Sequence, residues 1–285
     1  MKKKSDFNDI SLLAKNKQLR PPKSNYSEFY NYINQFNDKN KILISIILPL
    51  YNEEQTIRPI LESLPVHDSI EIIVVDDHST DNSLIEIGKV RKYKNIRVIT
   101  HKKNTGYGAA IISGIRFSTG EIIVTMDTDG QHNPEDIFSL IKPILDGEID
   151  YTIGSRYLGN YYYNLPISTR LGEVLTEKLI QLFFGIKIKN NQNGFRAFRR
   201  ELIKNFNTRL FIGYAFCTEQ ILQAKLCGYR IKECPIKVYD REFGSSKIIL
   251  RKLALNIFSC LFIYYLRKII MMMFKKRKDI SAQLF

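Results

Sequence analysis

The chain has 285 residues, 44% of them hydrophobic, which is enough for one large domain or two small ones with a substantial core. Its 43 Lys and Arg residues exceed 29 Asp and Glu residues, and the net charge of +14 suits an anionic partner such as nucleic acid, a phosphorylated substrate or an acidic membrane surface. The cysteines have no C-x-x-C spacing, which argues against a cysteine metal site and favours free thiols in a reducing compartment.

Three regions follow one another along the chain. Residues 1–40 are polar and contain Pro21-Pro22, so we expect an N-terminal extension that drapes over the domain or stays loose and has no evident chemical role. Residues 41–248 alternate between strand-like and helix-like runs and form the predicted main domain. Residues 249–285 are first apolar and then basic, and form a predicted C-terminal helical segment.

The alternation in the main domain predicts its fold. Strand-like runs at 42–50, 70–77, 96–100 and 121–129 are each followed by a helix-like run, at 55–64, 80–93, 107–118 and 134–146. This order implies right-handed crossovers and an α/β fold, in which a Rossmann-like, mostly parallel sheet is covered by helices on both faces. Ligands of such sheets bind at the carboxyl ends of the strands.

Acidic residues follow three of these strands. Glu53 comes after the first strand and Asp77 ends the second, while Asp127 and Asp129 follow the fourth in the stretch IIVTMDTDGQHNP. Because parallel strands end at one rim, we expect these carboxylates to converge there. Their repulsion raises some of their pKa values unless a cation or hydrogen-bond donors are present.

The glycine-rich loops that hold phosphates in other α/β folds are absent from the sequence. Neither G-x-G-x-x-G nor G-x-x-x-x-G-K-[ST] occurs, and NTGYGAA after the third strand predicts only a tight turn that opens a helix. A divalent metal on the D-x-D of residues 127–129 is the natural substitute. Hard oxygen ligands favour Mg²⁺ or Mn²⁺.

Ordered motifs in the chain resemble those of a known family. PLYNEE, IIVVDDHSTDNS, MDTDGQHNPED, IGSRYL and GFRAFRRE are similar to motifs of the family 2 glycosyltransferases of GT-A fold. CPIKVYDREFGSSKI, at 234–248, resembles the polyprenol-phosphate sugar synthases of that family, typified by dolichyl-phosphate mannose synthase. The resemblance implies a GT-A catalytic domain over residues 41–248. It also implies a hexosyltransferase that moves a sugar from a nucleotide sugar to a polyprenyl (dolichyl) phosphate.

The resemblance further assigns roles to individual residues. It places the nucleotide on Pro49, Tyr51, Glu53, Val75, Asp77 and Thr128, and the metal on Asp127, Asp129 and Gln131. The resemblance implies that Arg156 and Arg170 bind the acceptor phosphate. It implies that the basic pair Arg241 and Lys247 binds the phosphates of the nucleotide. Asp127, Asp129, Arg156, Arg170, Arg241 and Lys247 are thus the expected catalytic set, while Gln192, Asn193 and Gly194 line the sugar or acceptor side.

The implied chemistry accounts for these basic residues. A lipid phosphate is already ionised at neutral pH, so it needs no general base to attack the anomeric carbon. It does need cations, because two anions must approach and a diphosphate must leave. We therefore expect inversion at the anomeric carbon through a single in-line displacement.

The runner-up function is transfer to a hydroxyl group of a lipid or glycan, which requires a base. Relatives of that kind carry an acidic base, often in an E-D pair, and processive members add Q-x-x-R-W. This chain has no Trp, and Glu219 in FCTEQIL lacks a following Asp. Glu219 is therefore interpreted as a helix-surface or loop-orienting carboxylate rather than a base.

One departure from the family pattern concerns the loop before GFR. Relatives commonly have D-x-Q-x-G-F-R, whereas this chain has Asn190 in place of the Asp. Asn keeps the hydrogen-bonding shape and loses the charge. Nearby, His78 and His132 are interpreted as solvated loop histidines, and Asp81 as a cap of a helix that begins near Ser79.

The C-terminal segment bears on the acceptor. Residues 253–266 are uncharged, a stretch shorter than the roughly 20 residues of a spanning helix, and Arg267, Lys268, IIMMMF and KKRK follow. A span over 253–274 would bury two charges at about 2.5 to 3.5 kcal/mol each. We expect an interfacial or re-entrant helical hairpin, held by its basic end at the cytoplasmic face of a membrane. The alternative is a helix packed on the catalytic domain or on a second subunit.

A nucleic-acid-binding protein is the competing class. It predicts a basic stripe with interleaved aromatic residues and no acidic cluster at the strand ends, so we expect no nucleic-acid partner. The sequence does not distinguish GDP-mannose, UDP-glucose and UDP-N-acetylglucosamine as donors.

Overall fold

The computed structural model describes residues 25–36, 41–91, 94–162, 166–205, 211, 213–241, 243 and 250–283. Its strands are β1 (Ile44–Leu50), β2 (Ile70–Asp76), β3 (Ile96–Thr100), β4 (Ile122–Thr125), β5 (Tyr151–Tyr161), β6 (Arg196–Arg199) and β7 (Ile231–Val238). Its α-helices are α2 (Ser27–Ile33), α3 (Ile57–Ser63), α4 (Ser83–Val90), α5 (Tyr107–Phe117), α6 (Ile137–Leu145), α7 (Ile167–Phe184), α8 (Phe216–Leu226) and α9 (Leu250–Gln283). Two 3-10 turns, η1 (Pro134–Asp136) and η2 (Arg200–Asn205), complete the set.

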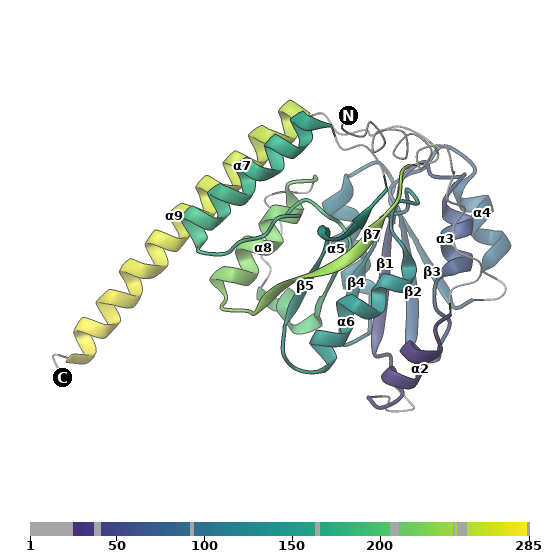
Figure 1. Cartoon of the computed structure of the whole chain (residues 1–285), viewed down its shortest axis with the longest axis horizontal. Coiled ribbons are helices and arrows are strands. Elements are labelled where there is room, and N and C mark those ends of the chain that lie inside the picture. Colours follow the sequence, from purple (N-terminus) through teal and green to yellow (C-terminus); the bar gives the residue numbers. More distant parts are fainter. Residues whose placement is uncertain are drawn as a thin grey trace, which may run out of the picture.

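The strands form one seven-stranded sheet in the order β3-β2-β1-β4-β6-β5-β7 (Figure 1). β3, β2, β1 and β4 are parallel, β6 runs antiparallel to both β4 and β5, and β7 pairs parallel with β5. The predicted mostly parallel α/β sheet is confirmed. The first four strands lie inside the predicted ranges. β1, β2 and β4 are rich in β-branched residues and almost entirely buried, as crossover helices on both faces require, whereas β3 at the sheet edge is only partly buried.

Helices cover both faces of the sheet, as predicted. On one face, α2, α3, α4 and α6 pack on alternate strand residues such as Leu48 and Val74. On the other face, α5 and α8 pack on the intervening residues, including Ile47 and Val75. This alternation is the period of two that a sheet imposes on its side chains.

Helix α4 begins later than the sequence predicts. Its first residue is Ser83, because residues 77–82 form a loop that contacts the loop after β1. The Asp81 carboxylate accepts hydrogen bonds from the backbone N–H groups of Ser83 and of Glu54, at 3.0 Å each. Asp81 thus supports the start of α4, as predicted, and also ties two loops together.

Part of the predicted N-terminal extension packs against the main domain. Tyr26, Phe29 and Ile33 of the α2 region are buried in the same core as α3 and α6. The Tyr26 hydroxyl donates to the Ser63 carbonyl at 2.7 Å, and the Phe29 ring centre lies 5.6 Å from that of Phe138. Of the two expectations for this extension, draping over the domain therefore describes the α2 region.

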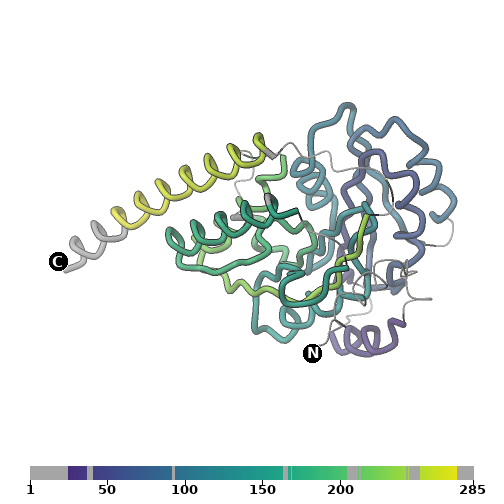
Figure 2. The backbone as a smooth tube through the Cα atoms, turned by 45° about the horizontal axis from the view of Figure 1, so that its top comes forward, coloured from purple at the N-terminus to yellow at the C-terminus, as the bar shows by residue number. Residues whose placement is uncertain are grey.

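A third layer lies outside α8. Helices α7, α8 and α9 share an apolar cluster that includes Ile180, Phe184, Leu222 and Leu261. Figure 2 shows α9 beside α7 and extending away from the sheet. The expectation of a helical hairpin is wrong, because α9 is one continuous helix from Leu250 to Gln283. Its residues 253–274 contain no glycine or proline that would break it.

Candidate functional site

The ends of β1, β2 and β4 lie at one rim, as the sequence predicts. β1 pairs parallel with β2 and with β4, so the three following loops leave the sheet at the same edge. The first two loops are joined directly, since the Asn52 backbone N–H donates to Ser79 Oγ at 3.0 Å and the Thr80 N–H donates to Asn52 Oδ1 at 2.7 Å. Asn52 and His78 adopt positive φ angles of 56° and 68° there.

Asp127 stands at the centre of this rim. Burial raises the pKa of its carboxyl group, and the neighbouring Asp129 raises that pKa further. Tyr107, the first residue of α5, contributes a side-chain hydrogen bond that opposes the rise. His132 also opposes it. The His132 ring is half-buried and packs 5.0 Å from the Phe195 ring centre, so its predicted solvated position is wrong, whereas His78 is exposed as predicted.

Gly194 provides the space that the Asp127 carboxylate occupies. A Cβ atom at position 194 would overlap the Asp127 carboxylate and the Tyr107 hydroxyl. The Gly194 carbonyl accepts a hydrogen bond from Thr125 Oγ1 at 2.6 Å, which fixes the glycine against the last residue of β4. The glycine of GFR is therefore a spacing requirement of the D-x-D.

Asp129 contacts a cationic side chain from the other end of the domain. Arg241 Nη2 lies 2.5 Å from Asp129 Oδ2, and Asp129 Oδ1 accepts the Gln131 backbone N–H at 3.1 Å. The Gln131 side-chain nitrogen donates to the Tyr239 carbonyl at 3.1 Å, which holds the loop after β7 beside the D-x-D. Lys247, the predicted partner of Arg241, lies outside the described residues.

The donor atoms at this rim fit a hard divalent cation. Asp127 Oδ1 is buried and has no hydrogen-bond partner in the described part of the chain, a costly state for a carboxylate oxygen unless a cation takes it. Two carboxylates and an amide oxygen match the preference of Mg²⁺ or Mn²⁺. No group of three His, Cys, Asp or Glu side chains with metal-binding geometry occurs among the described residues, so a cation here would need further ligands from outside these side chains.

The residues predicted to contact the nucleotide differ in whether their side chains lie at the rim. Pro49 and Thr128 are adjacent, since Thr128 Oγ1 donates to the Pro49 carbonyl at 2.8 Å, and Tyr51 and Glu53 are partly exposed at the same rim. The Val75 side chain is instead fully buried against α5, so only its backbone faces the loops.

Asp77 has a structural role that the sequence did not reveal. Burial opposes its ionisation, yet hydrogen bonds from Thr105, His101 and Gly106 hold the pKa of its carboxyl group below the ordinary value. The Thr105 and Gly106 backbone N–H groups donate at 2.8 and 2.7 Å. The Asp77 carboxylate thus anchors the turn that begins α5, and so the position of Tyr107.

A second cluster holds the two arginines that were predicted to bind an acceptor phosphate. Arg156 on β5 and Arg170 on α7 both lie beside the Glu173 carboxylate, at 3.5 and 3.9 Å. The Tyr157 hydroxyl donates to the same carboxylate, and the Arg170 guanidinium stacks 3.9 Å from the Tyr157 ring centre. Burial and Glu173 raise the pKa of Tyr157 to about 12, so its phenol stays protonated.

The loop 190–196 lies between the two clusters. Asn190 Oδ1 accepts from Arg156 Nη2 at 3.2 Å, and Asn193 Nδ2 donates to the Gly154 carbonyl at 2.9 Å. The fully buried Arg196 donates to the carbonyls of Asn193, Asn191 and Cys217 at 2.6, 2.8 and 2.7 Å. The GFR arginine therefore shapes this loop and the start of α8, while Asn190 braces Arg156.

Glu219 points away from both clusters. Its side chain is fully buried, so the helix-surface alternative is wrong, whereas a hydrogen bond from the Phe211 backbone fits the loop-orienting alternative. Glu219 Oε1 accepts from the Tyr264 hydroxyl at 2.8 Å, which places the carboxyl group between α8 and α9. Burial raises its pKa. The Glu219 carboxyl group thus contacts α9 in this structure.

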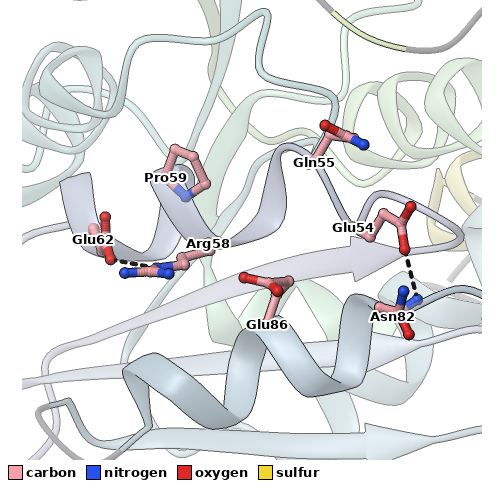
Figure 3. A pocket seen from close by; sticks show the side chains of 7 residues that line it. All are labelled: Glu54, Gln55, Arg58, Pro59, Glu62, Asn82 and Glu86. Atoms are coloured by element: carbon pink, nitrogen blue, oxygen red, sulfur yellow. Dashed lines mark hydrogen bonds and ion pairs between the residues drawn. The ribbon is translucent and has the colours of Figure 1, made fainter.

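A groove of 510 Å³ lies between α3 and α4, apart from these clusters (Figure 3). The seven residues that line it are Glu54, Gln55, Arg58, Pro59, Glu62, Asn82 and Glu86, and none of them is a predicted site residue. Its one arginine pairs with Glu62 at 2.8 Å, which leaves an acidic surface unsuited to a phosphate.

Comparison with known proteins decides the family. The glycosyl transferase family 2 profile matches residues 45–206, more than half of the chain. The chain belongs to glycosyl transferase family 2. A UDP-N-acetylglucosamine–dolichyl-phosphate N-acetylglucosaminyltransferase of Methanococcus voltae is 31% identical over 72% of this chain and 89% of its own length. A dolichol-phosphate mannosyltransferase of Pyrococcus furiosus is 31% identical over 72% of this chain and 59% of its own length.

Solved structures show the fold of this family 2 glycosyltransferase. Glucosyl-3-phosphoglycerate synthase of Mycobacterium tuberculosis, crystallised with Mn²⁺, UDP and phosphoglyceric acid, matches with a TM-score of 0.65 at 21% identity. The match covers 87% of this chain and 84% of that one. The predicted GT-A fold and the hexosyltransferase activity that its sequence motifs implied are confirmed.

Sequence reasoning missed two side chains of this candidate site. Tyr107 is the first residue of α5, which packs on β1 and β2, and the sequence holds no signal for its contact with Asp127. The contact of Glu173 could have been predicted more easily. Glu173 follows Arg170 by three residues in a helix, a spacing that brings side chains together.

Replacing Gly194 tests whether Asp127 must occupy its observed position. We expect Gly194→Ala to lower sugar transfer by about a hundredfold, because the new methyl group displaces a preorganised carboxylate. The assay is initial rate at saturating metal, with Mn²⁺ affinity measured by electron paramagnetic resonance. Gly172→Ala is the matched control, since no atom lies within 4 Å of the added methyl group. Equal rates for the two variants would contradict the spacing role.

Proposed function

We propose that this enzyme transfers a sugar from a nucleotide sugar to a polyprenyl phosphate, with inversion at the anomeric carbon. The observation that carries the proposal is the position of the Arg156 and Arg170 cluster. It lies on the inner side of α7, while the outer side of α7 is an exposed apolar stripe. An acceptor with a phosphate head and a hydrocarbon tail matches both sides of that helix. The two dolichyl-phosphate transferases among the relatives support the same acceptor class.

The nucleotide-sugar donor would bind at the strand-end rim. Pro49, Tyr51, Glu53 and Thr128 are placed to receive the nucleotide, and Asp127, Asp129 and Gln131 would hold Mg²⁺ or Mn²⁺. A bound divalent cation would supply charge stabilisation for the leaving diphosphate. Crystals of the mycobacterial relative with Mn²⁺ and UDP support a divalent metal in this fold.

Basic residues of the chain would stabilise the remaining negative charges of the acceptor phosphate and the leaving diphosphate. Arg156 and Arg170 orient the acceptor phosphate, one of whose oxygens attacks the anomeric carbon as the bond to the diphosphate breaks. Arg241, 2.5 Å from Asp129, would offset the charge that develops on the departing nucleoside diphosphate. No proton transfer to the enzyme is needed, because the attacking phosphate is ionised at neutral pH.

Two neighbouring helices support membrane attachment. On α7, Ile167, Leu171, Leu175 and Leu182 are 50% to 79% exposed, opposite the side that packs on α8. On α9, Leu255, Phe258, Phe262 and Leu266 are 43% to 69% exposed, again opposite the packed side. Soluble surfaces rarely gather so many large apolar side chains. We infer that both stripes dock into a lipid surface.

The charge and length of α9 refine this attachment. Arg251–Phe274 is 24 residues long and contains an 18-residue window with a mean hydropathy of 1.7, which by length and composition suffices to cross a bilayer. Lys268 Nζ donates to the Phe183 carbonyl at 2.6 Å and Arg267 stacks 4.9 Å from the Tyr264 ring centre, so both cations contact the protein. A helix packed along one side suits peripheral docking, with the basic chain drawn to the anionic cytoplasmic leaflet.

A donor panel tests the reaction. Membranes containing the protein are incubated with polyprenyl phosphate and labelled GDP-mannose, UDP-glucose or UDP-N-acetylglucosamine. We expect one donor to give a lipid-extractable product whose formation is abolished by EDTA and restored by Mg²⁺ or Mn²⁺. Membranes that lack the protein are the control. If every donor fails to label the lipid, the proposed acceptor is wrong.

The position of Glu219 separates phosphate from hydroxyl acceptors. We expect Glu219→Gln to keep transfer to polyprenyl phosphate within about threefold of the wild type, because the carboxyl group faces Tyr264 rather than the rim. Asp129→Asn is the contrasting variant, expected to lose about a hundredfold. Thermal melting shows whether each variant folds. A folded Glu219→Gln protein as inactive as Asp129→Asn would favour a hydroxyl acceptor.

Exposed apolar residues of α7 and α9 test the docking surface. We expect Leu182→Glu with Phe262→Glu to weaken binding to anionic vesicles by at least about tenfold, since each side chain contributes roughly 1.5 to 3 kcal/mol when buried. Vesicle flotation measures the bound fraction. Val66→Glu with Ile85→Glu is the matched control, because these residues are 55% and 61% exposed elsewhere on the domain. Equal binding by the two double variants would rule out this surface.

A further inference from the structure

We propose that Glu173 is a positioning residue of the acceptor site, whose carboxylate holds Arg156, Arg170 and Tyr157 and supplies the charge that Asn190 lacks. The inference rests on the proposed function, because it concerns the arginines assigned to the acceptor phosphate. It adds a residue and an electrostatic reason for the arrangement of those arginines.

One carboxylate joins side chains from two elements. Glu173 on α7 is 7% exposed, and its Oε1 lies 3.5 Å from Arg156 Nη2 on β5. Its Oε2 lies 3.9 Å from Arg170 Nη1 and accepts from the Tyr157 hydroxyl. The Arg170 guanidinium also stacks on the Tyr157 ring at 3.9 Å. Removal of the carboxylate would therefore release three contacts at once.

Electrostatics explain why a carboxylate stands in a phosphate site. Two guanidinium groups near the same point repel each other, and partial burial strengthens that repulsion. One negative charge between Arg156 and Arg170 removes most of it and leaves a net positive charge for an arriving anion. The separations of 3.5 and 3.9 Å exceed the 2.7 to 2.9 Å of a tight charged hydrogen bond. Each guanidinium has five N–H donors and can contact Glu173 and a phosphate together.

Asn190 is a second hydrogen-bond partner of Arg156. Asn190 Oδ1 accepts from the same Arg156 Nη2 at 3.2 Å, so Arg156 has a neutral partner on the loop and a charged partner on α7. The Asn190 backbone N–H donates to Glu233 Oε1 at 2.8 Å, and its Nδ2 donates to the Gly154 carbonyl at 3.3 Å, so the backbone as well as the side chain holds the loop. A carboxylate at either position 173 or position 190 would face the same guanidinium. Substitutions can therefore move the negative charge from position 173, on one side of Arg156, to position 190 on the other.

The test moves that charge and measures binding and catalysis in the full-length enzyme. We expect Glu173→Gln to raise the KM for polyprenyl phosphate by about tenfold with the donor KM unchanged, as for loss of a charged hydrogen-bond partner. Glu173→Gln with Asn190→Asp should return the acceptor KM to within about threefold of the wild type. Glu177→Gln, one turn further along α7 and equally buried, is the matched control and should leave the acceptor KM unchanged.

Calorimetry with farnesyl phosphate, without metal or donor, provides a readout that does not require turnover. We expect the same pattern of weakening and rescue in its dissociation constant. An unchanged or lower acceptor KM in Glu173→Gln would overturn the inference. Failure of the double variant to regain affinity, while its melting temperature matches the wild type, would also overturn it.

Failure of the proposed function is distinguishable from failure of the inference. If the wild type glycosylates no polyprenyl phosphate but binds farnesyl phosphate in a Glu173-dependent manner, the function is wrong and the role of Glu173 stands. If transfer to polyprenyl phosphate occurs and Glu173→Gln changes neither acceptor KM nor farnesyl phosphate affinity, the function stands and the role of Glu173 is wrong.

Discussion

Parallel pairing of β1 with β2 and β4 is the constraint on which the site depends. It brings the loops that carry Glu53, Asp77 and the D-x-D to one rim, where unbalanced carboxylates would repel one another. The protein balances each differently. Asp77 receives hydrogen bonds from the turn before α5, Asp129 contacts Arg241, and Asp127 keeps a buried oxygen without a donor from the described residues. That remaining imbalance is what makes the rim suited to a cation.

Charge repulsion also shapes the second cluster, where the groups that repel each other are positive rather than negative. There two arginines converge, and a single carboxylate on α7 reduces their repulsion. The loop 190–196 joins the two centres, because Gly194 makes room for Asp127 while Asn190 contacts Arg156. Buried Arg196 holds that loop through backbone carbonyls. One short loop thus contacts both the strand-end rim and the arginine cluster.

Sequence patterns predicted the features that depend on local periodicity. The ranges of β1 to β4, the sheet class and the meeting of Asp127 with the other strand ends follow from alternation and the parallel-sheet rule, whereas no ranges were predicted for β5, β6 and β7. Features that depend on packing between distant elements were not predictable. The docking of Phe29 required the surface of α6, and the contact of Tyr107 with Asp127 required the packing of α5 on the sheet. The continuity of α9 was misjudged, because its two internal charges suggested a break whereas Lys268 contacts the end of α7.

The two sides of α7 set a depth for the reaction. An α-helix with its side chains is about 10 to 12 Å thick, so Glu173 and the apolar stripe lie about one helix diameter apart. In the proposed orientation, the phosphate of an acceptor would be raised by that distance above the hydrocarbon boundary while its chain remained among the lipids. Bond formation would then take place in the headgroup layer, and the glycosylated lipid would return to the bilayer without extraction into water.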